Sequence, residues 1–112
     1  MSEFTDYLTD LLDDFGAVRV RRMFGGYGIY HEGFMFGLIA DDVLYLKVDA
    51  ENMAFFEELD LPTFTYLKNG RTMAMSYRQA PEDFLEDRLV AADWAMRSLA
   101  AAQRAKRKKP AS

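Results

Sequence analysis

Between residues 18 and 48 the hydrophobic side chains follow a period of two, and only short turns separate the alternating runs. The run Phe34–Ala40 is apolar at every position, which predicts an interior strand covered on both faces. Asp41-Asp42 alone separates it from the alternating run Val43–Val48. Parallel neighbours need a crossover of about a dozen residues or more, so these turns allow antiparallel pairing only. The segment therefore predicts an antiparallel meander that begins with a strand at Val18.

A second antiparallel pair is predicted further along the chain. Thr63–Leu67 and Thr72–Tyr77 alternate on either side of Lys68-Asn69-Gly70-Arg71. Asn-Gly between alternating runs is the strongest short-range signal for a hairpin, because a type I′ turn needs positive φ at both central residues. We therefore expect a two-residue turn at Asn69-Gly70.

The first helix is predicted from six apolar residues at helical spacing, Phe4, Tyr7, Leu8, Leu11, Leu12 and Phe15. Ser2 is the expected N-cap, and Gly16 is expected to end the helix. Three acids, Asp10, Asp13 and Asp14, lie toward the C-terminal end, where the helix dipole disfavours anions. We therefore expect at least one of them to pair with one of the arginines that follow, Arg19, Arg21 and Arg22.

Two further helices complete the predicted fold. Asp49 is expected to cap a helix over about residues 50–59, and Pro81 to open the last helix. The side chains expected to face the core are Met53, Phe56 and Leu59 in the former, and Leu85, Leu89, Ala92, Met96 and Leu99 in the latter. This order predicts one α+β domain, a mostly antiparallel sheet of five to six strands with N-terminal, middle and C-terminal helices.

The charges divide the chain into an acidic body and a basic tail. The tail, residues 104–112, holds five cations and no acid, which leaves −9 on residues 1–103 of a chain whose net charge is −4. Its cations are Arg104, Lys106, Arg107, Lys108 and Lys109. An acidic body repels phosphate, so direct nucleic-acid binding is not expected, and we interpret the tail as a frayed helix end. Contact of the tail with nucleic acid or an acidic partner is the alternative.

Most enzyme chemistry is missing from the residue inventory. The chain has no cysteine, and its single histidine, His31, lies beside a predicted turn. Thiol catalysis, thiolate metal sites and two-histidine zinc sites are therefore ruled out, and we expect no catalytic residue, no metal and no cofactor. No apolar stretch approaches the roughly 20 residues that span a bilayer. Because the N-terminus is acidic, unlike a signal peptide, we expect a cytoplasmic protein.

The glycine cluster Gly25-Gly26-Tyr27-Gly28 could mark a phosphate-binding loop or a packing feature. A phosphate loop needs a following helix whose N-terminal amides hold the anion, whereas here a strand pattern follows. Glycines inside a strand mark a bulge or a close approach of two backbones, and we favour that interpretation. Some of the aromatic and methionine content exceeds what one small core needs, and a second copy of the chain is its expected cover.

The same region carries a family resemblance. The run Arg22-Met23-Phe24-Gly25-Gly26-Tyr27-Gly28-Ile29-Tyr30 resembles the N-terminal domain of the TfoX/Sxy competence regulators, and the match extends over residues 3–103. The resemblance implies a bacterial, non-enzymatic α+β domain of secretion-chaperone-like architecture, and implies no established active-site residues. Full-length members are similar to co-regulators that act with the cyclic-AMP receptor protein. The chain ends where the helical C-terminal domain of the family would begin, so a stand-alone N-terminal domain is expected.

We therefore predict a protein-interaction module in gene regulation, a co-regulator of the competence type whose partner is a protein such as a transcription factor. The competing prediction is a small-molecule-binding or enzymatic domain that uses Gly25–Tyr30 with Arg21 and Arg22. A deep pocket with convergent polar groups at that place would favour the competing prediction.

Overall fold

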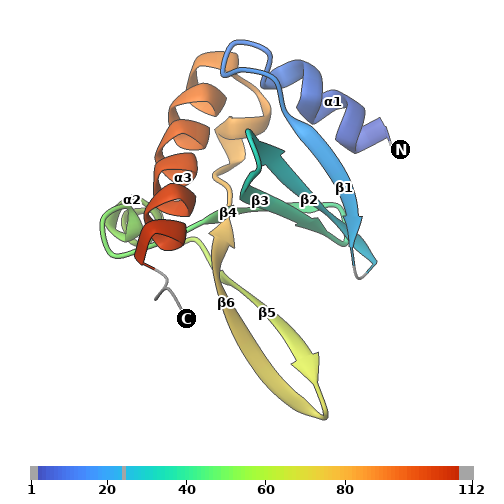
Figure 1. The fold of residues 1–112 in the computed structure, drawn as a ribbon, viewed down its shortest axis with the longest axis vertical. Helices are drawn as coiled ribbons and strands as arrows, with labels where there is room; N and C mark the ends of the chain where they lie inside the picture. The colour runs from blue at the N-terminus through green and yellow to red at the C-terminus, as the bar shows by residue number, and fades with distance from the viewer. Residues whose placement is uncertain (1–2, 24, 109–112) are drawn as a thin grey trace.

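The computed structural model describes residues 3–23 and 25–108, and in them a single sheet of six strands. The order across the sheet is β1-β2-β3-β4-β6-β5, and every neighbouring pair is antiparallel (Figure 1). The strands are β1 (Arg19–Met23), β2 (Gly26–His31), β3 (Phe34–Ala40), β4 (Val43–Lys47), β5 (Thr63–Lys68) and β6 (Arg71–Gln79). The predicted meander and the predicted hairpin are both confirmed.

The tight turns of the sheet use backbone conformations that their residue types tolerate. Asp41 and Asp42 both have positive φ, 51° and 59°, in the turn between β3 and β4. Asn69 and Gly70 have φ of 52° and 76°, so both residues are left-handed as a type I′ turn requires. Aspartate, asparagine and glycine adopt this region at the least cost, which is why these short turns hold the strand register.

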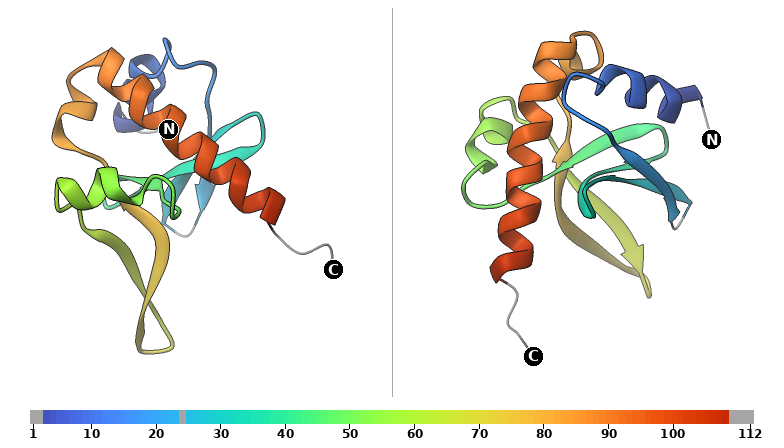
Figure 2. Two further views of the ribbon diagram at one scale, coloured as in Figure 1. Left: turned by 90° about the vertical axis from the view of Figure 1, so that its left-hand side faces the viewer. Right: turned by 45° about the horizontal axis from the view of Figure 1, so that its top comes forward.

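The helices lie mainly on one side of the sheet. They are α1 (Glu3–Leu11), α2 (Met53–Glu58), the 3₁₀ helix η1 (Glu82–Leu85) and α3 (Arg88–Lys108). The long helix α3 crosses the sheet face over β3 and β4, and its N-terminal end lies beside α1 (Figure 2). The core fills the space between these helices and the sheet, around Leu8, Phe36, Leu46, Phe56 and Phe84. None of the helices within the described ranges is long and apolar enough to cross a membrane.

The last helix begins later than expected and buries a different stripe. Pro81 opens only η1, and the Asp87 carboxylate then accepts hydrogen bonds from the N–H groups of Leu89 and Val90, at 2.8 and 3.2 Å, which starts α3. The residues of α3 that are buried are Ala91, Trp94, Ala95, Ser98, Ala101 and Ala102. The expected stripe is wrong at Leu89 and Met96, which are 77% and 62% exposed.

Two other sequence-based expectations about packing are wrong. In α2 only Phe56 is buried, whereas Met53 and Leu59 are partly exposed. The acids of the first helix are compensated by Arg88, at the start of α3, whose guanidinium lies 3.5 Å from Asp10 and 3.8 Å from Asp14. Across the described residues, the arginines of β1 form no ion pair with these acids. The expected cap at Ser2 lies outside the described residues.

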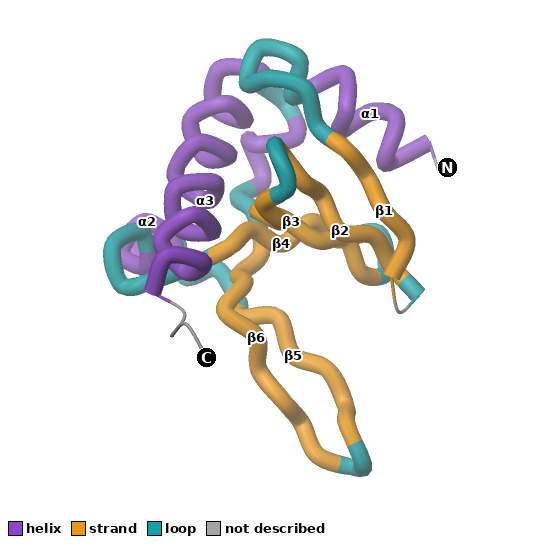
Figure 3. Tube along the Cα trace, in the orientation of Figure 1, coloured by secondary structure: helices purple, strands orange, loops and turns teal. Residues whose placement is uncertain are grey.

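The hairpin of β5 and β6 projects from the body of the domain (Figure 3). β4 pairs with β6 through Tyr77, Arg78 and Gln79, and the Val48 N–H, just after β4, donates to the Ser76 carbonyl at 2.9 Å. Among the described residues, this pairing does not continue further along the hairpin. We refer to residues 64–75 of this hairpin as the arm. Most residues of the arm are exposed. Its position leaves a concave space between the arm and the adjacent ends of β1 and β2, at Met23 and Gly26.

Candidate functional site

That space is an apolar groove of about 630 Å³. Its floor is formed by Leu38 and Ala40 of β3, and its first wall by Met23, Gly26 and Tyr27. Leu38 points away from the main core, because adjacent strand residues point to opposite faces and the neighbouring Ile39 belongs to that core. The groove thus opens on the sheet face opposite α3.

The arm supplies the second wall of the groove, through Phe64, Tyr66, Leu67, Lys68 and Met75. The Phe64 ring lies 4.8 Å from the ring of Tyr45 in β4, and it stacks on Tyr66 at 6.1 Å with an angle of 19° between the planes. These ring contacts connect the arm to the central sheet. The outer part of the arm is less covered, since Leu67 is 76% exposed and Tyr66 38% exposed.

The base of the arm is fixed by polar contacts of a buried tyrosine and a lysine. The Tyr77 hydroxyl donates to the carbonyl of Met35 at 3.1 Å, and burial raises the pKa of Tyr77 well above its usual range. The Lys47 ammonium lies 5.2 Å above the Tyr77 ring and donates to the Ser76 hydroxyl at 2.6 Å. Burial lowers the pKa of Lys47, and the nearby Asp49 partly opposes that shift. The arm therefore leaves the sheet in a defined direction.

The glycines of the first wall allow close packing. A Cβ on Gly26 would lie 2.1 Å from the carbonyl oxygen of Ile39, a distance that no side chain tolerates. A Cβ on Gly28 would lie 2.9 Å from the sulfurs of Met23 and Met35. The expected close approach of two backbones is therefore present at Gly26. The register shift of β2 against β3 falls after the glycines, between Ile29 and Tyr30.

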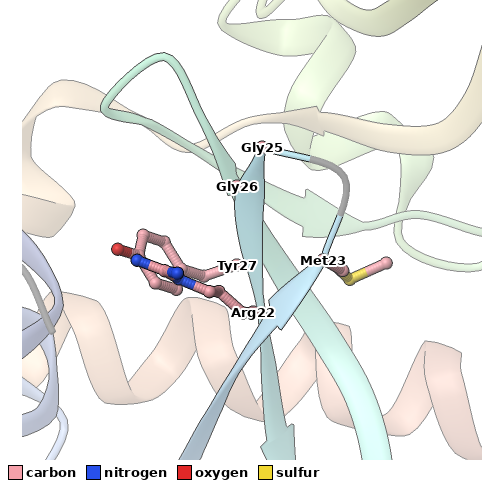
Figure 4. Close-up of a pocket in the computed structure, with 5 residues that line it drawn as sticks. All are labelled: Arg22, Met23, Gly25, Gly26 and Tyr27. Atoms are coloured by element: carbon pink, nitrogen blue, oxygen red, sulfur yellow. The ribbon is translucent and has the colours of Figure 1, made fainter.

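A smaller hollow of about 290 Å³ lies at the end of the β1–β2 hairpin and is lined by Arg22, Met23, Gly25, Gly26 and Tyr27. Arg22 and Tyr27 are register partners, and their side chains extend to the same side of the hairpin, while Met23 extends to the other (Figure 4). Of the described residues in this lining, only Arg22 is charged. Phe24 of the family motif lies outside the described residues.

The two arginines of the competing prediction do not converge on one site. Arg21 neighbours Arg22 in β1, so its side chain points to the opposite face of the strand. The Arg21 guanidinium lies 5.7 Å from the ring centre of Tyr30. Arg21 and Tyr30 line a separate hollow of about 590 Å³ together with Arg19, His31 and Glu32, so the residues of the competing prediction are divided between two places.

The single histidine packs against the loop that precedes β1. Its Nδ1 atom lies 2.7 Å from the carbonyl oxygen of Ala17, and its ring centre lies 5.0 Å from that of Phe15. A Cβ on Gly16 would lie 3.1 Å from the His31 ring. In the part of the chain that the structure describes, no group of three or more His, Cys, Asp or Glu side chains is placed to hold a metal ion.

The basic tail is in part a packed helix. α3 continues through Lys108, and the Arg104 guanidinium forms two hydrogen bonds to the Asp49 carboxylate, at 2.6 and 3.0 Å. The Lys106 ammonium lies 5.2 Å above the Phe34 ring, and Arg107 is exposed. The expectation of a frayed end is therefore wrong for Arg104. Lys109 lies outside the described residues.

The structure also reveals a separation of charge that the sequence analysis missed. The six strands contain seven Lys or Arg residues and no Asp or Glu: Arg19, Arg21, Arg22, Lys47, Lys68, Arg71 and Arg78. The acids lie in helices, turns and loops. The net charge of residues 1–103 predicts an acidic surface, but it does not show how the charges are distributed. Counting the charged residues within each predicted strand would have indicated a cationic sheet.

Fold and site together define a two-layer α+β domain with an apolar groove on the sheet face opposite its longest helix. The chain belongs to the TfoX N-terminal domain family, whose model matches residues 10–102. It is similar to the DNA transformation protein TfoX1 of Aliivibrio fischeri (strain ATCC 700601 / ES114), with 32% identity over 84 residues. That match covers 75% of this chain, which spans about 40% of the length of the relative. The resemblance in the β1–β2 motif is thereby confirmed.

Proposed function

We propose that this protein is a non-enzymatic protein-interaction module, a transcriptional co-regulator in DNA transformation, and that the groove receives its protein partner. The family and the name of the relative support the link to DNA transformation. A role in transcription implies action in the cytoplasm.

The groove is the observation that carries the proposal. Its walls combine the family motif, through Met23 and Tyr27, with the apolar side chains of the arm. Tyr66, Leu67 and Met73 of the arm are large apolar residues with exposed fractions of 38%, 76% and 40%. Apolar side chains gathered at a concave surface are typical of protein-binding sites, and methionines suit surfaces that adapt to a partner.

The lining of the groove also supports a binding role over catalysis. Among the described residues that line it, Lys68 is the only titratable side chain besides the two tyrosines. Acid–base or nucleophilic chemistry requires a second group within hydrogen-bonding reach of the first, and no such pair lines the groove within the described chain.

A matched pair of substitutions tests the proposal in the host cell. Leu67 in the groove and Leu89 on α3 are exposed to nearly the same extent, 76% and 77%. Cells that lack the chain are complemented with the wild type, Leu67→Ser or Leu89→Ser, and transformation frequency and competence transcripts are measured. We expect Leu67→Ser to lower both several-fold and Leu89→Ser to restore both. Normal transformation without the chain, or equal effects of the two variants, would contradict the proposal.

A further inference from the structure

We propose that the occupant of the groove is an acidic amphipathic segment of the partner protein, with apolar side chains in the groove and carboxylates at its rim. This inference rests on the proposed function, and it specifies the chemistry of the partner.

The apolar half of this proposal follows from the lining. The floor and both walls present aliphatic, methionine and aromatic side chains, among them Leu38, Met23, Met75 and Phe64. Removing such surface from water favours association in proportion to the apolar area covered. A purely polar segment would leave this area hydrated, so the occupant must carry apolar side chains.

The acidic half follows from the charges around the groove. Lys68 lines it, and Arg71 is the cross-strand neighbour of Lys68, so both side chains lie on the same face of the arm. Arg21 lies two residues before Met23 in β1, so it shares the strand face on which Met23 lines the opposite wall, and Arg21 is exposed. Asp41 and Asp42 follow Ala40 in the adjacent turn, but neither lines the groove. Carboxylates of a partner therefore meet Lys68 and Arg71 at the arm, and Arg21 on the strand face of the opposite wall.

The aromatic residues of this face favour a protein over a nucleic acid. Single-stranded nucleic acids bind sheets through bases that stack on free aromatic rings. Here the Phe64 ring already contacts Tyr45 and Tyr66, and the Tyr30 ring lies against Arg21. Tyr77 is buried. The remaining open surface is mostly aliphatic, which suits side chains of a protein rather than bases.

The test measures binding of labelled synthetic peptides to the whole protein by fluorescence anisotropy. The first peptide combines leucine and phenylalanine with glutamate, the second has lysine in place of glutamate, and the third has serine in place of leucine and phenylalanine. A single-stranded oligothymidylate is the nucleic-acid probe. Lys68→Glu is compared with Arg107→Glu, because both residues are exposed and both changes alter the net charge equally. Circular dichroism verifies that both variants fold.

We expect the acidic amphipathic peptide to bind more tightly than the other probes. Lys68→Glu should weaken this binding at least about threefold and strengthen binding of the lysine peptide, whereas Arg107→Glu should change neither. Four results would overturn the inference. These are equal affinity for the acidic and lysine peptides, equal effects of the two variants, tighter binding of the oligothymidylate, and a dimer in sedimentation velocity that Lys68→Glu dissociates. The transformation frequency of cells that carry Leu67→Ser is measured separately. If that frequency falls but the protein does not prefer the acidic peptide, the proposed chemistry of the partner is rejected and the proposed function is not.

Discussion

The Arg104 guanidinium binds the Asp49 carboxylate through two hydrogen bonds, Nε to Oδ2 at 2.6 Å and Nη2 to Oδ1 at 3.0 Å, across 55 residues of sequence. The same carboxylate accepts the N–H groups of Glu51 and Asn52, at 3.0 and 3.2 Å, in the turn before α2. Asn52 in turn donates to the carbonyl of Lys47 at 3.0 Å. The end of α3 is therefore connected to the end of β4 and to the start of α2.

Replacing Arg104 should destabilise the domain. Both side chains of the Arg104–Asp49 pair are only 19% exposed, so Arg104→Met leaves a carboxylate without its charged partner in a partly desolvated place. We expect a loss of about 1–3 kcal/mol in the free energy of unfolding, measured by urea denaturation. Arg107→Met is the control, since Arg107 is exposed and should change stability by less than about 0.5 kcal/mol. Equal losses in the two variants would contradict a structural role for Arg104.

The same pair predicts how stability depends on pH. The hydrogen bond from Arg104 holds the pKa of Asp49 below its usual range, and this effect outweighs the opposing effect of burial. A carboxylate with a lowered pKa stabilises the folded state fully above its unfolded pKa of about 3.9, and this contribution disappears as the pH falls through the folded pKa. The stability difference between wild type and Arg104→Met should therefore be constant from about pH 7 to pH 5 and shrink below about pH 4. Urea titrations across this range measure it, and a difference that grows toward acid would refute this origin.

The strands could be predicted from the sequence, whereas the packing of α3 could not. Alternation and short turns determine antiparallel pairing locally, so the meander and the Asn69-Gly70 hairpin follow from nearby residues alone. The sequence pattern predicts that large apolar residues of α3, such as Leu89, face the core, but Leu89 is exposed. The helix instead approaches the sheet through small residues such as Ala91 and Ala95, whose weak hydrophobic signal gives no clear period.

Only one wall of the groove could be found from the sequence. The motif around Met23 and Tyr27 is recognisable as a run of residues, but the arm lies about 40 positions further along the chain. The two walls face each other because β4 pairs with β6, whereas β5, which follows β4 in the chain, lies at the edge of the sheet. This choice of neighbour depends on the packing of the whole sheet. The position of Lys68 in the lining of the groove follows from this topology, and the sequence analysis missed it.

The turn of the arm provides a test of local backbone strain. Gly70 has a φ of 76°, and a Cβ added there meets nothing within 4 Å, so a side chain would act only through the backbone. Gly70→Val should destabilise by more than about 1 kcal/mol, because β-branched residues are outliers at positive φ. Amide hydrogen exchange should show the loss in β5 and β6 first. Asn69→Gly is the neutral control, and unchanged exchange in Gly70→Val would count against the type I′ turn.

Ser98 is a buried position where a smaller side chain should be tolerated. Its side chain is fully buried in α3, and its hydroxyl has no hydrogen-bond partner among the described residues. An unpaired buried hydroxyl is unfavourable, and alanine also has the higher helix propensity. Ser98→Ala should therefore raise the free energy of unfolding by about 0.5–1 kcal/mol in urea denaturation. A loss of 1 kcal/mol or more would indicate that the hydroxyl is hydrogen-bonded in solution.

Substitution of Gly26 tests whether this glycine of the family motif is required for packing or for contact with a ligand in the groove. Its φ is not positive, so only space limits substitution, and a Cβ would lie 2.1 Å from the Ile39 carbonyl oxygen. Gly26→Ala must push β2 away from β3, and we expect a loss of at least about 1–3 kcal/mol in the free energy of unfolding. Gly25→Ala, with open space but a φ of 78°, should cost about 1 kcal/mol through backbone strain alone. Thermal and urea denaturation of the two variants measure the difference. If Gly26→Ala were as stable as the wild type, close packing of β2 on β3 would not explain this glycine, and contact with a ligand in the groove would become its better explanation.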